Sequence, residues 1–91
     1  MGEGSYKAPK GLIRVRADII RNKIHQIIIT GDFFMYPEDS LFLLEKVLKG
    51  TNTFRETILT KIEDFYTSTG VITPGVTPQD FTEAIMRALD S

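Results

Sequence analysis

The stretch GLIRVRADIIRNKIHQIIIT, residues 11–30, decides the fold of this chain. Over residues 11–20 apolar side chains alternate with charged ones, which is the pattern of a strand with one buried face. Residues 24–30 are rich in β-branched side chains and predict a second strand. The polar residues between them suit a short turn, so the two strands should form an antiparallel hairpin. The side chains expected to point inward from the first strand are Ile13, Val15, Ala17 and Ile19.

Three helices are predicted after the hairpin, with bounds Pro37–Lys49, Phe54–Ser68 and Pro78–Leu89. Acidic residues after a proline favour the start of the first helix, and Thr53 to Glu56 matches a capping box before the second. Thr77 is a good N-cap for the third, with proline at its first position. The side chains expected to point inward are Leu41, Leu44, Leu48, Phe54, Ile58, Ile62, Phe65, Phe81, Ile85 and Leu89.

This order of elements predicts an α+β fold, a small antiparallel β-sheet covered on one face by about three helices. An isolated hairpin is marginally stable in water. A third strand is therefore expected, either from Ser5 to Pro9, from Phe33 to Tyr36, or from a partner. Residues 1–10 are otherwise interpreted as a flexible N-terminal lead-in, and residues 11–91 as a single domain.

Composition excludes several classes of function. The 91 residues include no cysteine and one histidine, which leaves no disulfide, thiol nucleophile or Cys-type zinc site. A net charge of −1 offers no basic field for nucleic acid or membrane surfaces. The apolar runs are far shorter than the ~20 residues of a membrane span. With no signal peptide recognisable in the first ten residues, a cytoplasmic location is expected.

Candidate acid–base residues are not grouped. His25 is most simply a surface position in a strand. The neighbouring carboxylates Glu38/Asp39 and Glu63/Asp64 would point about 100° apart on a helix, which makes them poor general acid–base pairs. No Gly-rich phosphate loop is present. The sequence therefore predicts no catalytic centre.

The unusual segment is GDFFMYP, residues 31–37. Successive side chains of an extended backbone point to opposite faces, so Phe33 and Phe34 cannot both enter one core. One ring is expected at the surface as an anchor for a partner or ligand. Gly31 is expected to allow a sharp turn, and Asp32 to fix it by accepting backbone hydrogen bonds. The alternative is a plain strand-to-helix connection whose aromatics only close the core.

The segment KAPKG, residues 7–11, is the second unusual stretch. It is either a solvated tail or a basic arm. A basic arm would approach an anionic group, such as a carboxylate or phosphate, on a partner's ligand.

From about Lys7 to Leu89 the sequence resembles the C-terminal accessory domain of lipoate-protein ligases. That domain has a Lys-x-x-x-Gly-Leu lead-in to a strand, a second strand, a Gly-Asp-Phe-Phe motif and a helix that closes in Leu-x-Gly. The corresponding segments here are Lys7–Leu12, Ile24–Thr30, Gly31–Phe34 and Leu44–Gly50. The resemblance implies a fold similar to SufE and IscU proteins, which act through a cysteine that this chain lacks.

In that family the domain usually follows a catalytic domain that binds lipoate and ATP, forms lipoyl-adenylate with Mg²⁺ and lipoylates acceptor proteins. In some archaeal ligases the two parts are separate chains. The resemblance implies a non-catalytic accessory subunit, required chiefly for adenylation, that binds no cofactor by itself. It implies a heterodimer with the catalytic subunit, indirect contact with lipoyl-acceptor domains, and no nucleic acid or membrane.

The residues expected near the partner or its ligand are Lys7, Lys10, Gly11, Gly31, Asp32, Phe33 and Phe34; none is expected to be catalytic or to bind metal. The alternative function, from a different class, is a non-enzymatic interaction module. Such a module would be a homodimeric adaptor that uses the aromatic segment as its interface.

Overall fold

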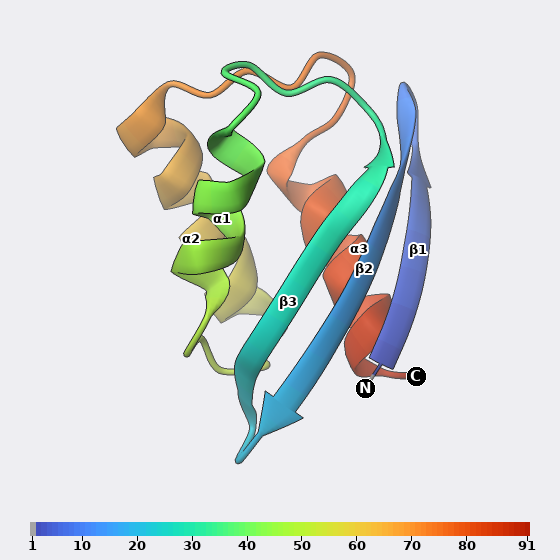
Figure 1. Ribbon diagram of the computed structural model, residues 1–91, viewed down its shortest axis with the longest axis vertical. Helices are drawn as coiled ribbons and strands as arrows, with labels where there is room; N and C mark the ends of the chain where they lie inside the picture. The colour runs from blue at the N-terminus through green and yellow to red at the C-terminus, as the bar shows by residue number, and fades with distance from the viewer. Residues whose placement is uncertain (1) are drawn as a thin grey trace.

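The computed structural model describes residues 2–91, which form three strands followed by three helices (Figure 1). The sheet is antiparallel with strand order β1-β2-β3, and the helices lie on one side of it, as the predicted α+β fold requires. The bounds are β1 (Gly2–Ala8), β2 (Gly11–Ile20), β3 (Lys23–Asp32), α1 (Ser40–Leu48), α2 (Arg55–Thr69) and α3 (Pro78–Leu89).

The predicted hairpin is confirmed. The strand over residues 11–20 has the expected bounds, and β3 is longer than expected by one residue at its start and two at its end. Arg21 and Asn22 form the turn, with φ angles of 54° and 63°. Positive φ at both central residues is typical of the tight turn whose twist matches the flanking strands.

The predicted inward face of β2 is confirmed for Ile13, Val15 and Ala17, which are buried. The prediction for Ile19 was wrong, because its side chain is 40% exposed. A register shift after Asp18 leaves His25 without a partner in β2, as in a β-bulge, and a bulge bends and twists the ladder. The end of the hairpin beyond this point extends past the helices (Figure 1).

A flexible lead-in was expected over residues 1–10, of which residue 1 lies outside the described residues. The expectation was wrong for Gly2–Ala8, which form β1 and pair with β2 along the full length of that strand. The expected third strand is therefore the one near Ser5–Pro9 and not the one at Phe33–Tyr36. A Cβ atom at Gly2 or Gly4 would overlap the backbone of α3. These glycines thus let α3 lie directly on β1. This contact with the helix explains why a polar segment is an ordered strand.

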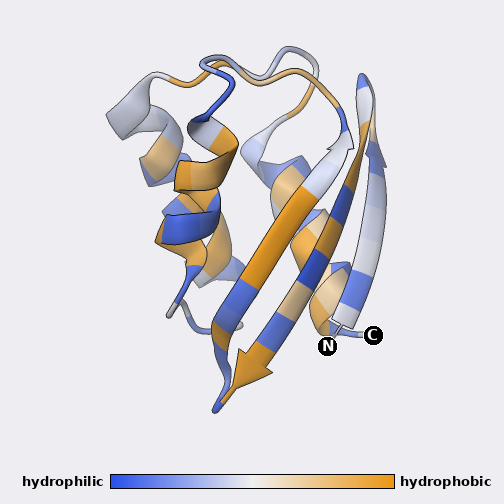
Figure 2. Ribbon diagram, in the orientation of Figure 1, coloured by the Kyte–Doolittle hydropathy of each residue, from blue (hydrophilic) through white to orange (hydrophobic). Residues whose placement is uncertain are grey.

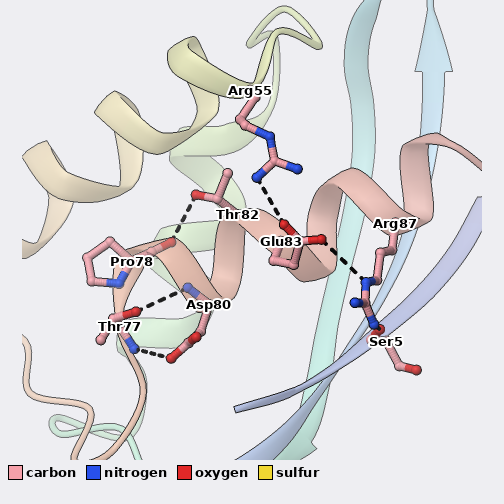
Figure 3. A network of polar contacts seen from close by, with 8 residues as sticks. All are labelled: Ser5, Arg55, Thr77, Pro78, Asp80, Thr82, Glu83 and Arg87. Carbon is pink, nitrogen blue, oxygen red and sulfur yellow. Dashed lines mark hydrogen bonds and ion pairs between the residues drawn. The ribbon is translucent and has the colours of Figure 1, made fainter.

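Helix α3 begins as predicted, at Pro78. The Thr77 hydroxyl accepts a hydrogen bond from the Asp80 N–H (3.2 Å), and the Asp80 carboxylate accepts one from the Thr77 N–H (2.9 Å) (Figure 3). This reciprocal capping box satisfies two backbone donors that a helix start would otherwise leave free. Toward the other end, Arg87 donates to the Ser5 carbonyl (3.1 Å) and ties α3 to β1.

The start predicted for the first helix was three residues early, because Pro37 lies in a turn in which its carbonyl accepts from the Ser40 N–H. The box predicted at Thr53 and Glu56 was also wrong. Phe54 is the N-cap of α2, and no side chain in the described part of the chain caps this helix. The Thr53 N–H instead donates to Asn22, so these residues are held against the hairpin and the Phe54 ring is exposed.

The core lies between the sheet and the helices, where most of the remaining inward predictions are confirmed. The inward prediction for Phe54 was wrong, because its side chain is 72% exposed, and Leu41 and Leu89 are only partly buried. Figure 2 shows apolar residues on the elements that enclose it. Among residues 2–91 no helix is both long and apolar enough to cross a membrane. The largest fully buried side chains are Phe81, Ile13, Ile24, Ile29, Leu44, Leu48, Ile58, Ile62, Ile85, Val15 and Thr82.

Candidate functional site

Three segments that are far apart in the sequence meet at one end of the sheet, at the top of Figure 1. They are the β1–β2 turn, the connection after β3, and the loop between α2 and α3. Leu12 of β2 pairs with Asp32 of β3, and Tyr36 forms a β-bridge with Ile72. The fold therefore brings together the two unusual sequence segments, residues 7–11 and 31–37, and places the loop between α2 and α3 beside them.

All seven predicted site residues lie at this end. Lys7 and Lys10 are exposed, and the stem of Lys10 lies so close to Gly75 that a Cβ atom there would overlap it. A Cβ at Gly11 would overlap the Asp32 carbonyl oxygen. The β1–β2 turn with its two lysines, residues 7–11, is called the basic turn. It is packed against both other segments and is not a free arm.

The role expected of Gly31 and Asp32 is corrected. They do not form a turn, because β3 continues through both of them. A side chain at Gly31 (φ 155°) would overlap the Leu12 carbonyl oxygen, so the glycine is needed for close approach of two strands. Among residues 2–91 the exposed Asp32 carboxylate accepts no hydrogen bond, and its expected turn-fixing role is therefore wrong.

The prediction that one of two adjacent rings lies at the surface is confirmed. Phe33 points inward and packs edge-on against Phe81, with ring centroids 5.3 Å apart and planes at 85°. Phe34 is 68% exposed and lies parallel to the Tyr36 ring, 6.3 Å between centroids. The structure thereby identifies Phe33 as the core ring and Phe34 as the outward one.

The sequence did not indicate Ile72, which is 60% exposed and lies on the loop between α2 and α3. Its N–H and C=O exchange two hydrogen bonds of 2.9 Å with Tyr36. This bridge joins residues 36 positions apart, so no local pattern could have shown it. We call Phe34, Tyr36 and Ile72 together the aromatic patch.

A buried hydroxyl group, that of Thr73, and a partly buried one, that of Tyr66, hold the loop that carries Ile72. The Thr73 hydroxyl donates to the Val76 carbonyl (2.7 Å), so its one hydrogen is used. The contact of 2.7 Å between Thr73 and the Tyr66 hydroxyl must therefore be donated by Tyr66. Burial is the main cause that raises the pKa of Tyr66 above its ordinary value of 10.0.

This network predicts a pH dependence. A raised pKa in the folded state means that Tyr66 stabilises the fold fully below pH 10.0 and that this contribution is lost as the pH rises further. We expect the free energy of unfolding of the wild type to fall as the pH rises above about 10. Tyr66→Phe should remove part of that fall, measured by urea unfolding at each pH. Equal slopes for both proteins would contradict this role for Tyr66.

The chemistry of this end suits binding. A hollow of about 260 Å³ runs along Gly31, Phe33 to Tyr36, Glu38 and Leu41. In the described chain no three His, Cys, Asp or Glu side chains are grouped so that they could hold a metal ion. His25 is exposed on β3 and belongs to no such group. The end thus presents an apolar aromatic surface with two lysines beside it.

Fold and site together define a small α+β domain with an exposed aromatic surface at one end. A family model described as "Bacterial lipoate protein ligase C-terminus" matches residues 3–85. The chain is 53% identical over 81 residues to "Lipoate-protein ligase A subunit 2" of Thermoplasma acidophilum, covering 89% of this chain and 83% of that protein. The chain belongs to the family of lipoate-protein ligase C-terminal domains.

A solved structure agrees. A chain from the bi-partite lipoate protein ligase of Thermoplasma acidophilum, studied with its E2 lipoyl domain, superposes with a TM-score of 0.84 at 52% identity. The match covers 91% of each chain. The resemblance stated from the sequence is confirmed, and so is its main implication, an accessory part of a lipoate-protein ligase.

Proposed function

We propose that this chain binds a separate catalytic lipoate-protein ligase subunit as a heterodimer and is required there for the ATP-dependent formation of lipoyl-adenylate. The observation that carries the proposal is the exposed aromatic patch at the end where the family's Gly-Asp-Phe-Phe motif and the basic turn meet. Exposed aromatic side chains held by a rigid scaffold are typical centres of protein interfaces.

The reacting groups belong to the catalytic subunit in this proposal. Lipoate, ATP and Mg²⁺ bind there in this proposal, and this chain binds none of them by itself. Lys7 and Lys10 could approach an anionic group at the edge of the partner's pocket. Lipoyl-acceptor domains are reached only through the catalytic subunit. The cytoplasmic location expected from the sequence stays part of this proposal.

The direct test is ATP–pyrophosphate exchange with lipoate. We expect no exchange from this chain alone, little from the catalytic subunit alone and strong exchange from an equimolar mixture. Size-exclusion chromatography of the mixture at micromolar concentration should give one 1:1 peak. Exchange by the purified chain without its partner, or two independent peaks from the mixture, would overturn the proposal.

A separate measurement distinguishes the alternative of a homodimeric adaptor. In that case the aromatic patch would bind a second copy of the chain. Sedimentation equilibrium of the chain alone should show a monomer under our proposal. A stable dimer that ignores the catalytic subunit would favour the adaptor.

A further inference from the structure

Helix α1 carries apolar side chains outside its buried side as well as on it. Leu44 and Leu48 are fully buried against the core, while Phe42, Leu43 and Val47 are 75%, 48% and 39% exposed. Exposed apolar side chains that adjoin one another on a helix are normally covered by protein. The outer side of α1 is therefore suited to contact with another chain.

A groove of about 430 Å³ lies between this outer side and α2. Leu43 and Val47 line it from α1, and Phe65 lines it from α2. The α2 wall also contains Ser68 and Thr69, whose hydroxyls donate to carbonyls one helical turn back, at 2.8 and 2.7 Å. Because these polar groups are already satisfied, apolar side chains could cover the wall without leaving a donor unpaired.

The aromatic patch by itself is too small for a stable interface. Even if Ile72 is counted at the size of an aromatic side chain, roughly 150–250 Å², three residues exposed by half to two thirds offer only about 350 Å². A specific interface takes about 800 Å² from each partner. The hollow beside the patch reaches Leu41, which places α1 next to the patch. The outer side of α1 is the apolar surface onto which the contact can extend.

The sheet edges are less suitable as the surface that extends the contact. The Glu45 carboxylate accepts a hydrogen bond of 2.7 Å from the Ile29 N–H on the free edge of β3. On β1 the Ser91 hydroxyl accepts one of 2.9 Å from the Glu3 N–H. Side chains thus occupy positions on both edges where an added strand would pair.

We propose that the interface with the catalytic subunit continues from the aromatic patch along the outer side of α1 into the α1–α2 groove. This inference rests on the proposed function and names the surface that carries it. Lys46 and Lys61 line the groove with one acidic side chain, Asp64. The segment that fills it is apolar and bears acidic side chains, which meet the two lysines.

The test compares two phenylalanines of equal exposure. Phe42 on α1 is 75% exposed, and Phe54, on the connection at the opposite end of α1, is 72% exposed (Figure 1). We expect Phe42→Ala to weaken binding of the catalytic subunit by about tenfold or more in isothermal titration calorimetry. Phe54→Ala should change the affinity less than about twofold, and neither variant should shift thermal unfolding, because both rings lie in solvent.

The outcomes separate this inference from the proposed function. If the wild type binds and Phe34→Ala weakens binding while Phe42→Ala and Leu43→Ser do not, the extension along α1 is wrong and the proposed function stands. If Phe42→Ala and Phe54→Ala weaken binding equally, α1 has no special part and the inference fails. If the wild-type chain does not bind the catalytic subunit, both fail together.

Discussion

Replacing Gly31 by alanine should destabilise the fold by about 3 kcal/mol or more, because the new Cβ overlaps a backbone atom that cannot rotate away. That atom is the Leu12 carbonyl oxygen on the neighbouring strand, and Gly31 itself has a φ of 155°. For a domain of this size the loss corresponds to a fall in Tm of roughly 12–24 °C. The measurement is thermal unfolding by circular dichroism.

Gly70 is the matched control. It also has a positive φ, 69°, but among residues 2–91, apart from its two neighbours in the chain, no heavy atom lies within 4 Å of the position of a Cβ. Gly70→Ala should therefore cost only about 1 kcal/mol, the price of a left-handed alanine. Similar losses for the two variants would mean that backbone conformation, and not close approach to β2, is the reason for glycine at position 31.

Replacing Phe34 by alanine should leave folding almost unchanged and weaken association with the catalytic subunit by about 2 kcal/mol, roughly thirtyfold. The ring is exposed and contacts Tyr36, so its loss opens no cavity. Phe33→Ala should have the opposite effect. This ring packs against the fully buried Phe81, and its removal should cost about 2–4 kcal/mol of folding stability.

The readouts for this pair are thermal unfolding of each variant alone and pyrophosphate exchange after titration with the catalytic subunit. Phe34→Ala should reach full activity only at about thirtyfold higher concentration of this chain. Phe33→Ala should show near-normal affinity at a temperature at which it is still folded. If both variants fold normally and support exchange at wild-type concentrations, the motif has neither role.

Local pattern was sufficient where a segment's structure depends on its own residues. The alternation over residues 11–20 predicted β2 with its bounds, since the period of two can be satisfied only by a strand with one buried face. Thr77, Pro78 and Asp80 supply the start of α3 from within one turn. Such elements were predicted because their signals lie within a few residues.

Local pattern failed where distant contacts decide. The capping-box pattern at Thr53 and Glu56 is not used, because Thr53 is hydrogen-bonded to the hairpin tip at Asn22. The polar, glycine-containing segment before Ala8 is a strand for two reasons. Helix α3 lies against Gly2 and Gly4, and the segment pairs with β2 along its full length. In both cases a contact between segments outweighs the local preference of the residues.

By itself the sequence determined the fold class, the hairpin, the family and the rule that only one of Phe33 and Phe34 can be buried, since these follow from short-range spacing and from motifs. Only the tertiary structure decided that Phe34 is the outward ring and that Ile72 joins it. It also decided that α1 keeps a second apolar side in solvent. Exposure depends on which surfaces the other elements cover, and that is a property of the assembled core.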